Sequence, residues 1–203
     1  MYSPSPDPEF TERQFFKAVF SISFGIWRAT DSFKVDDGNG MRKVLTELVH
    51  KDREKRDKAW NLILDATHSD RTAESYAEEF VSHFTPDENT ALCNDLFELL
   101  ARMMTFTSGE SGRKFEHLQS IARILRISPA EIKRIGIVYF QQKGDNFAML
   151  GCQSGDAPGE IKKNYRNLAK EYHPDAARAR GVPEVFIEQF SERFRKLHEA
   201  YSA

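Results

Sequence analysis

The sequence predicts an all-α protein in which an N-terminal helical bundle is followed by a smaller C-terminal helical hairpin. Apolar residues recur every three or four positions along most of the chain, as they do on the buried face of a helix. No segment shows the sustained alternation of apolar and polar residues that indicates a half-buried strand. Thr85-Pro86 and Ser128-Pro129 each precede an acidic residue at the third position after the hydroxyl, which is typical of a helix start.

The composition of the chain excludes several classes of protein. A chain of 203 residues with 40% hydrophobic residues can build one domain or two small ones around a packed core. The formal net charge of −2 argues against a nucleic-acid-binding protein, which would carry a basic excess. Cys93 and Cys152 are too few for a disulfide framework or a four-thiolate zinc site, so we expect reduced core thiols.

Prolines, glycines and changes in pattern divide the chain. Residues 1–9 contain three prolines and predict a flexible tail. Residues 10–140 predict a bundle of six or seven helices, and the polar residues 141–145 a linker. We expect residues 146–203 to form a separate, smaller helical unit.

The most apolar stretch, from Phe15 to Trp27, predicts a buried helix. It has 13 residues and includes Lys17, whereas a membrane span needs ~20 nearly uncharged residues. Asp7 and Glu9 precede it, where a secretory signal would carry basic residues. We therefore expect no membrane span in this chain and a cytoplasmic location, while an anchor upstream in a longer natural chain stays open.

The other helices of the bundle are predicted from apolar faces at helical spacing. An acidic loop, residues 30–40, follows the first helix, and residues 108–112 interrupt the helical pattern again. The Ser128 start opens a last helix that extends to about Phe140. The intervening faces are, in order, Met41, Val44, Leu45, Leu48 and Val49; Ala59, Trp60, Ile63 and Leu64; Tyr76, Phe80 and Phe84; Leu92, Leu96, Leu99, Leu100 and Met103; and Phe115, Leu118, Ile121, Ala122 and Leu125.

Residues 158–172 predict a helix with one apolar side and one cationic side. Pro174 must end this helix at Tyr172 or His173, because proline has no amide hydrogen and disfavours the helical conformation of the residue before it. The apolar side consists of Ile161, Tyr165, Leu168, Ala169 and Tyr172. The cationic side, here called the basic face, consists of Lys162, Lys163, Arg166 and Lys170.

A second helix is predicted from Val182-Pro183 onward, after a loop of sequence AARARG. Its apolar stripe consists of Phe186, Phe190, Phe194, Leu197 and Tyr201. Complementary stripes favour an antiparallel hairpin with His173-Pro174-Asp175 at its tip. We expect the Asp175 carboxylate to accept backbone hydrogen bonds and order the turn.

These features together resemble a J-domain, the co-chaperone module of the DnaJ family. The resemblance covers Phe147 to Tyr201 and includes FAMLGC as a short first helix, the YHPD helix end and RFRKLHEAY on the last helix. It implies activation of a DnaK-type (heat-shock seventy) chaperone ATPase. In the family the HPD motif, here His173, Pro174 and Asp175, is needed to stimulate ATP hydrolysis, and the basic face docks on an acidic surface of the chaperone.

The chain also departs from the family pattern. Asn167 and Glu171 stand where the family often has basic residues, and Ala176 replaces a common basic residue after HPD. These changes would weaken or retune electrostatic docking. No glycine- and phenylalanine-rich linker and no repeated CxxC motif is present, so we expect no client-holding region of the DnaJ type.

A J-domain behind a helical domain resembles the DjlA-like group, whose preceding domain is TerB-like, a fold named for tellurite resistance. Metal binding is suspected for some TerB-like loops. Here the first loop offers Asp31, Asp36 and Asp37, and the second offers Glu110 and Glu116. Calcium sites need six or more oxygen ligands and the spacing does not fit an EF-hand, so we expect no metal site.

Two other functions stay open beside the co-chaperone. One is a TerB-like scaffold or stress-sensing protein whose J-like unit only binds proteins, and the other is a metal-binding stress protein. There is no Gly-rich phosphate loop, HExxH or GxSxG motif, so neither an enzyme nor a cofactor is expected. The client and the partner of residues 10–140 are not identified by the sequence.

Overall fold

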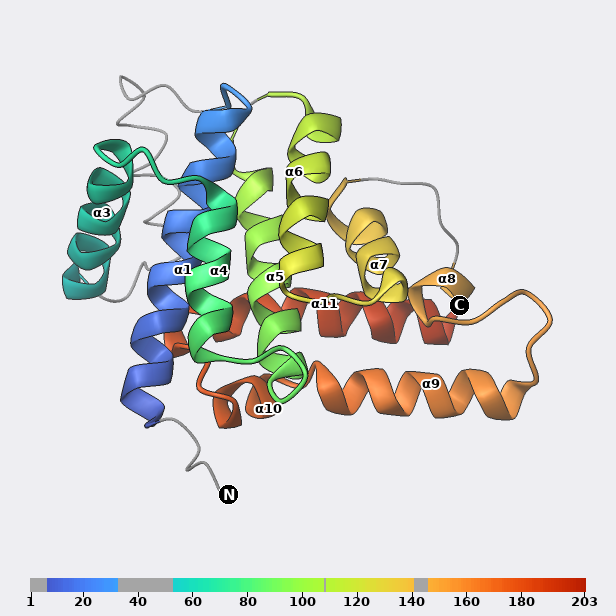
Figure 1. Cartoon of the computed structure of the whole chain (residues 1–203). Coiled ribbons are helices and arrows are strands. Elements are labelled where there is room, and N and C mark those ends of the chain that lie inside the picture. The colour runs from blue at the N-terminus through green and yellow to red at the C-terminus, as the bar shows by residue number, and fades with distance from the viewer. Residues whose placement is uncertain (1–6, 33–52, 108, 141–145) are drawn as a thin grey trace.

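The computed structural model describes residues 7–32, 53–107, 109–140 and 146–203 (Figure 1). These ranges contain helices and no strand, which confirms the all-α prediction. The helices before residue 141 are α1 (Pro8–Ala29), α3 (Arg53–Thr67), α4 (Ala73–His83), α5 (Thr90–Thr105), α6 (Ser111–Ile124) and α7 (Pro129–Phe140). They are followed by α8 (Asn146–Met149), α9 (Pro158–Glu171), α10 (Pro174–Ala179) and α11 (Glu184–Ser202). The helix predicted over Met41 to Val49 lies outside the described residues.

Helix α1 is the centre of the bundle and packs against α3, α4, α5 and α6. Its apolar stretch is buried as predicted, with Phe15, Phe20 and Trp27 fully inside the core. The helix begins at Pro8, inside the predicted tail, because the Asp7 carboxylate accepts a hydrogen bond from the Glu9 amide and caps the first turn. Among the described helices, none is long and apolar enough to cross a membrane.

The two predicted helix starts have different outcomes. Ser128 caps α7 as expected, because its hydroxyl accepts a hydrogen bond from the Glu131 amide at 3.2 Å. The Thr85 start is wrong, since α5 begins only at Thr90. The backbone amides of Glu88 and Asn89 both bond to the Thr85 carbonyl and close an isolated turn ahead of that helix.

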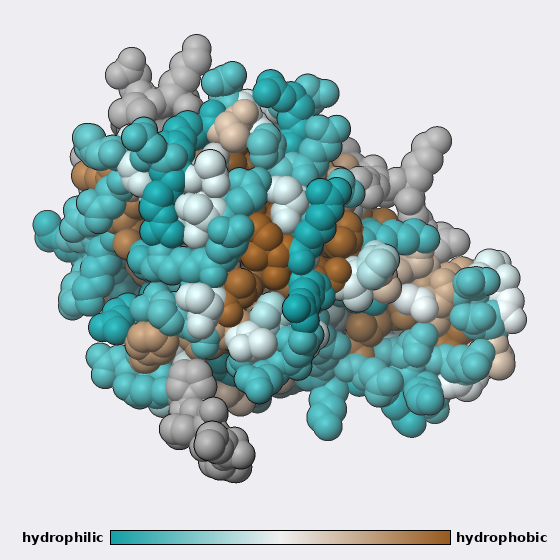
Figure 2. Space-filling model, viewed as in Figure 1, coloured by the Kyte–Doolittle hydropathy of each residue, from teal (hydrophilic) through white to brown (hydrophobic). Residues whose placement is uncertain are grey.

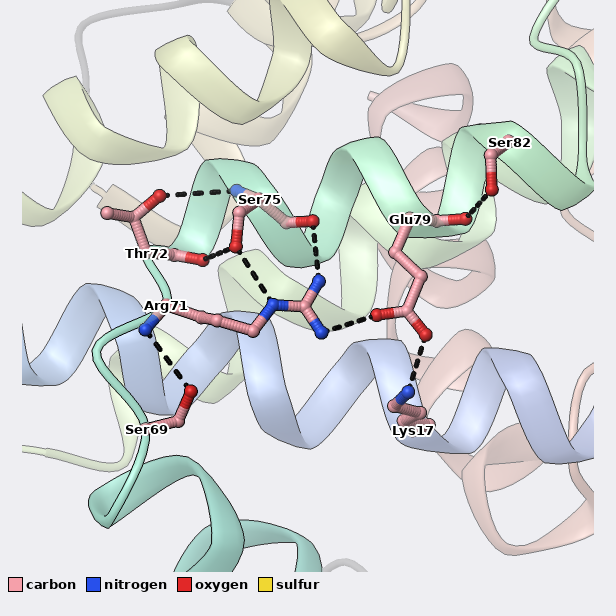
Figure 3. Close-up of polar contacts among 7 residues, drawn as sticks. All are labelled: Lys17, Ser69, Arg71, Thr72, Ser75, Glu79 and Ser82. Carbon is pink, nitrogen blue, oxygen red and sulfur yellow. Dashed lines mark hydrogen bonds and ion pairs between the residues drawn. The ribbon is translucent and has the colours of Figure 1, made fainter.

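Charged side chains also join α1 to α4 across the bundle surface. Figure 3 shows the Glu79 carboxylate between Lys17 of α1 and Arg71, which precedes α4. Partial burial acts to raise the pKa of Glu79, but the hydrogen bonds and charges of these two cations outweigh it and lower the pKa. The ionised form of Glu79 is therefore favoured in the folded protein.

Helices α9 and α11 form the predicted hairpin. They lie side by side in Figure 1, and the rings of Tyr165 and Tyr201 stack at a centroid distance of 4.2 Å. Leu168, Tyr172 and Leu197 close a small core between them, to which Val138 of α7 contributes. The hairpin therefore includes one side of the bundle in its own packing.

The other half of α11 enters the main core of the bundle. The Phe186 ring packs against Phe15, Phe16 and Phe20 of α1, at centroid distances of 5.7 to 6.4 Å. Phe190 belongs to the same core. The predicted domain boundaries stay predictions. Residues 146–203 share a core with the bundle, because the first half of the apolar stripe of α11 packs in the main core and the second half packs in the small hairpin core.

Candidate functional site

The basic face lies on the solvent side of α9. The four side chains of this face are all exposed, and no ion pair within the described part of the chain engages them. Hydrophilic residues line the lower edge of the arm that α9 forms in Figure 2. Four exposed cations on one rigid helix can steer and orient an acidic partner. The predicted basic face is thus a continuous, accessible surface, although its docking role stays a prediction.

The HPD motif adjoins the C-terminal end of this face. Helix α9 ends before Tyr172, as Pro174 requires, and a new short helix, α10, starts at Pro174. The AARARG loop prediction is wrong here, because most of that segment is helical and Pro174 is suited to a first helical position. His173 is the N-cap, and its Nδ1 accepts a hydrogen bond from the Asp175 amide at 3.1 Å.

The roles within the motif also differ from the expectation for Asp175. No backbone hydrogen bond to its carboxylate is found among the described residues; the His173 ring orders the turn instead. Because Nδ1 accepts that bond, the neutral imidazole carries its proton on Nε2. The side chains of His173 and Asp175 are 49% and 75% exposed, so both are accessible to a partner.

Arg178 forms an ion pair with Asp175 of the motif. The Arg178 guanidinium donates to Asp175 at 2.6 Å and to both oxygens of Glu184 at 2.9 and 3.0 Å. Hydrogen bonds from Arg178 to Glu184, together with the Asp175 charge, raise the pKa of Arg178 further above its ordinary value. Since all three groups are exposed, a charged partner could replace these ion pairs with its own.

Buried polar groups of the bundle hold the residues on either side of the motif. The Tyr172 hydroxyl donates to Glu131 of α7 at 2.7 Å, and Glu131 also pairs with Arg134. On the far side of α10, Arg180 binds both carboxylate oxygens of Asp95 in α5 at 2.5 and 2.8 Å. The hairpin tip therefore lies against the bundle instead of projecting freely.

The structure also places the three residues that depart from the family pattern. The Glu171 carboxylate accepts a hydrogen bond from the Asn94 side chain of α5 at 3.2 Å, so it takes part in the contact with the bundle. Asn167 is exposed on α9, and Ala176 is half-buried on α10. Where the family often has a basic residue, Glu171 therefore makes an intramolecular contact.

The acidic segments show no metal centre within the described residues. Asp36 and Asp37 lie outside those residues, and Glu110 and Glu116 are both exposed. No group of three His, Cys, Asp or Glu residues in the described ranges could hold a metal ion. In the second segment, the buried Lys114 ammonium donates to the Met104 and Thr107 carbonyls at 3.1 and 2.6 Å, and burial lowers its pKa.

The two cysteines are free and buried, as predicted. Burial and the nearby Asp95 carboxylate raise the pKa of Cys93 to about 12. A thiol with that pKa stays protonated at neutral pH and is a poor nucleophile.

Sequence reasoning missed the anchoring residues Asp95, Glu131, Arg134 and Arg180. A signal for Asp95 was present, since it lies three residues after Leu92 and four before Leu99, on the apolar face of α5. A charged residue on a buried face needs a partner. The sequence could not identify that partner, because Arg180 is 85 residues away.

Comparison with known proteins supports the reading of the C-terminal part. The DnaJ domain family matches residues 145–203. Co-chaperone protein DjlA of Coxiella burnetii is 23% identical over 219 aligned residues, which cover 98% of this chain and 79% of that protein. DjlA of Mannheimia succiniciproducens is 35% identical over 57 residues, covering 28% of this chain and 20% of that protein.

A third relative also aligns over a short segment only, as the second does. Chaperone protein DnaJ of Bacillus mycoides is 41% identical over 59 residues, which are 29% of this chain and 14% of that protein. No solved structure matches the chain. The TerB-like resemblance of residues 10–140 stays a prediction. Residues 145–203 are a DnaJ domain, and nearly the whole chain is similar to a DjlA co-chaperone.

Proposed function

We propose that this protein binds a DnaK-type chaperone and stimulates its ATP hydrolysis, while residues 10–140 direct the complex to a client or site. The observation that carries the proposal is the adjacency of an exposed HPD motif and an exposed basic face at the end of one helix. The two free cysteines support a cytoplasmic location, which is part of the proposal, because cytosolic thiols are kept reduced.

The arrangement suits two successive steps. Exposed cations accelerate encounter with an acidic surface and fix the register of the complex. The His173 ring and the Asp175 carboxylate then contact the partner, and they need no bond-making chemistry of their own. A co-chaperone of this kind favours the hydrolysis-competent conformation of the chaperone, which is a population shift in another protein.

Single-turnover ATP hydrolysis by the cognate DnaK-type chaperone tests the proposal. We expect the wild-type protein to stimulate hydrolysis and His173→Gln to abolish that stimulation while its circular dichroism is unchanged. His68→Gln is the matched control, since it makes the same substitution at an exposed histidine at the end of α3. A folded His173→Gln protein that stimulates normally would contradict the assignment of the motif, and a folded wild-type protein without stimulation would favour the scaffold alternative.

A further inference from the structure

Two buried acids of the bundle bracket the segment that carries HPD. Glu131 is 2% exposed and binds the hydroxyl of Tyr172, the residue immediately before the motif. Asp95 is 1% exposed and binds Arg180, which closes α10 on the other side of the motif. Both acids belong to helices of residues 10–140, so the motif is held at each end by the other part of the chain.

Arg180 joins three helices through one guanidinium. Its Nε and Nη2 bind the two oxygens of Asp95 in α5. Its Nη2 also donates to the Glu171 carbonyl at 3.1 Å, one of the carbonyls that the end of α9 leaves without a helical partner. Since Arg180 itself caps α10, the ends of α9 and α10 are fixed to each other and to the bundle.

The energetics make this link rigid. Taking the Asp95 carboxylate out of water is costly, and its two hydrogen bonds with Arg180 help to offset that cost. The planar guanidinium binds a carboxylate through two parallel hydrogen bonds, which fixes direction as well as distance. Neither tie depends on a long exposed side chain whose motion would blur the geometry.

We propose that the bundle positions the HPD motif relative to the basic face through Asp95 and Glu131. This inference rests on the proposed function and adds to it, because the bundle then takes part in activating the chaperone as well as in targeting. Asp95, Glu131 and Arg180 are positioning residues. The two acids are too deeply buried to touch a partner, so any effect they have on the chaperone acts through the motif.

Positioning and mere stability have different signatures in a titration. If the Asp95 tie is lost, the basic face still captures the chaperone, but the motif no longer meets it at one angle. The plateau of stimulated hydrolysis then falls while the half-saturating concentration stays the same. If part of the protein simply unfolds, the active concentration falls, so the curve shifts to higher concentration and reaches the same plateau.

The test is single-turnover hydrolysis by the DnaK-type chaperone, titrated with the full chain carrying Asp95→Asn. We expect the plateau to fall by about threefold or more, with the half-saturating concentration within about twofold of wild type. Arg180→Lys is the second variant, because it leaves Asp95 a cationic partner while removing the bidentate geometry, and it should lower the plateau in the same way. Glu79→Gln is the control, since it breaks an ion pair within the bundle away from the motif.

The outcomes separate the two proposals. A wild-type protein that gives no stimulation contradicts the proposed function itself. If the wild type stimulates and folded Asp95→Asn reaches the full plateau, with or without a shift in concentration, the positioning proposal is overturned. A lowered plateau in Arg180→Lys alone would assign Arg180 to direct contact with the chaperone, which also overturns it.

Discussion

The two ends of the α9–α11 hairpin differ in what surrounds them. At the inner end, Phe186 packs among rings of α1 and Arg180 pairs with Asp95 of α5. At the outer end, Tyr165 stacks on Tyr201, which is exposed at the protein surface. The difference shows that the basic face lies on an exposed side of α9, whereas the backbone on either side of HPD is held by the bundle.

The largest expected effect tests whether the inner end shares a core with the bundle. Phe186→Ala removes a fully buried ring, so we expect it to lower the free energy of unfolding by about 3–5 kcal/mol. Trp27 and Trp60, the two tryptophans of the chain, both lie in bundle helices, so urea denaturation followed by tryptophan fluorescence reports on the bundle. The midpoint of that transition should fall.

Leu197→Ala is the matched variant at the outer end, because Leu197 is equally buried but belongs to the small hairpin core. It should shift the tryptophan transition less than Phe186→Ala does. An unchanged tryptophan midpoint in Phe186→Ala would contradict a shared core, since the inner end would then unfold independently of the bundle.

Two tyrosines of the hairpin, Tyr165 in α9 and Tyr172 directly after it, give the next effect in size. Tyr172→Phe removes a hydroxyl that bonds to the buried Glu131 carboxylate and should cost about 1–3 kcal/mol of unfolding free energy. Tyr165→Phe removes a hydroxyl that bonds to the exposed His198 and should stay within about 0.5 kcal/mol of wild type. Chemical denaturation of the pair measures the difference, and equal costs would contradict the distinction between the two ends.

Charge reversal on the outer part of α9 should change binding without changing the fold. Lys162→Glu combined with Arg166→Glu should weaken binding to the DnaK-type chaperone by about tenfold at low salt, since like charges then face each other. Wild-type affinity should also fall as salt is added. Titration calorimetry measures both, with Arg123→Glu and Lys133→Glu, exposed cations of α6 and α7, as a control of equal charge change. Salt-independent wild-type binding would argue against the basic face.

The smallest expected effect concerns an ion pair on the surface of the bundle. The pKa of Glu79 is lowered in the folded protein, so its ionisation stabilises the fold above its ordinary pKa of about 4.5. That contribution is lost as pH falls through the folded-state pKa. Glu79→Gln should therefore be less stable than wild type by below about 1 kcal/mol at neutral pH, and the difference in thermal midpoint should disappear in acid. A difference that grows toward low pH would contradict this sign.

Several helix ends could be predicted from local sequence. Pro174 ends α9 wherever the helix lies, and the Ser128 hydroxyl caps α7, because both effects act within four residues. The helix start predicted at Thr85 was wrong because the residues there form a turn that does not continue into a helix. That turn closes on its own backbone before α5 begins.

The sequence by itself determined the helical class, the order of most helices, the basic face and the position of HPD, since each depends on periodicity or on a few neighbouring residues. Only the tertiary structure decided that α11 divides its apolar stripe between two cores, and that Asp95 meets Arg180. These pairings join residues far apart in the chain. An apolar face or a buried charge requires a partner, but only the packing of the helices determines which residue supplies it.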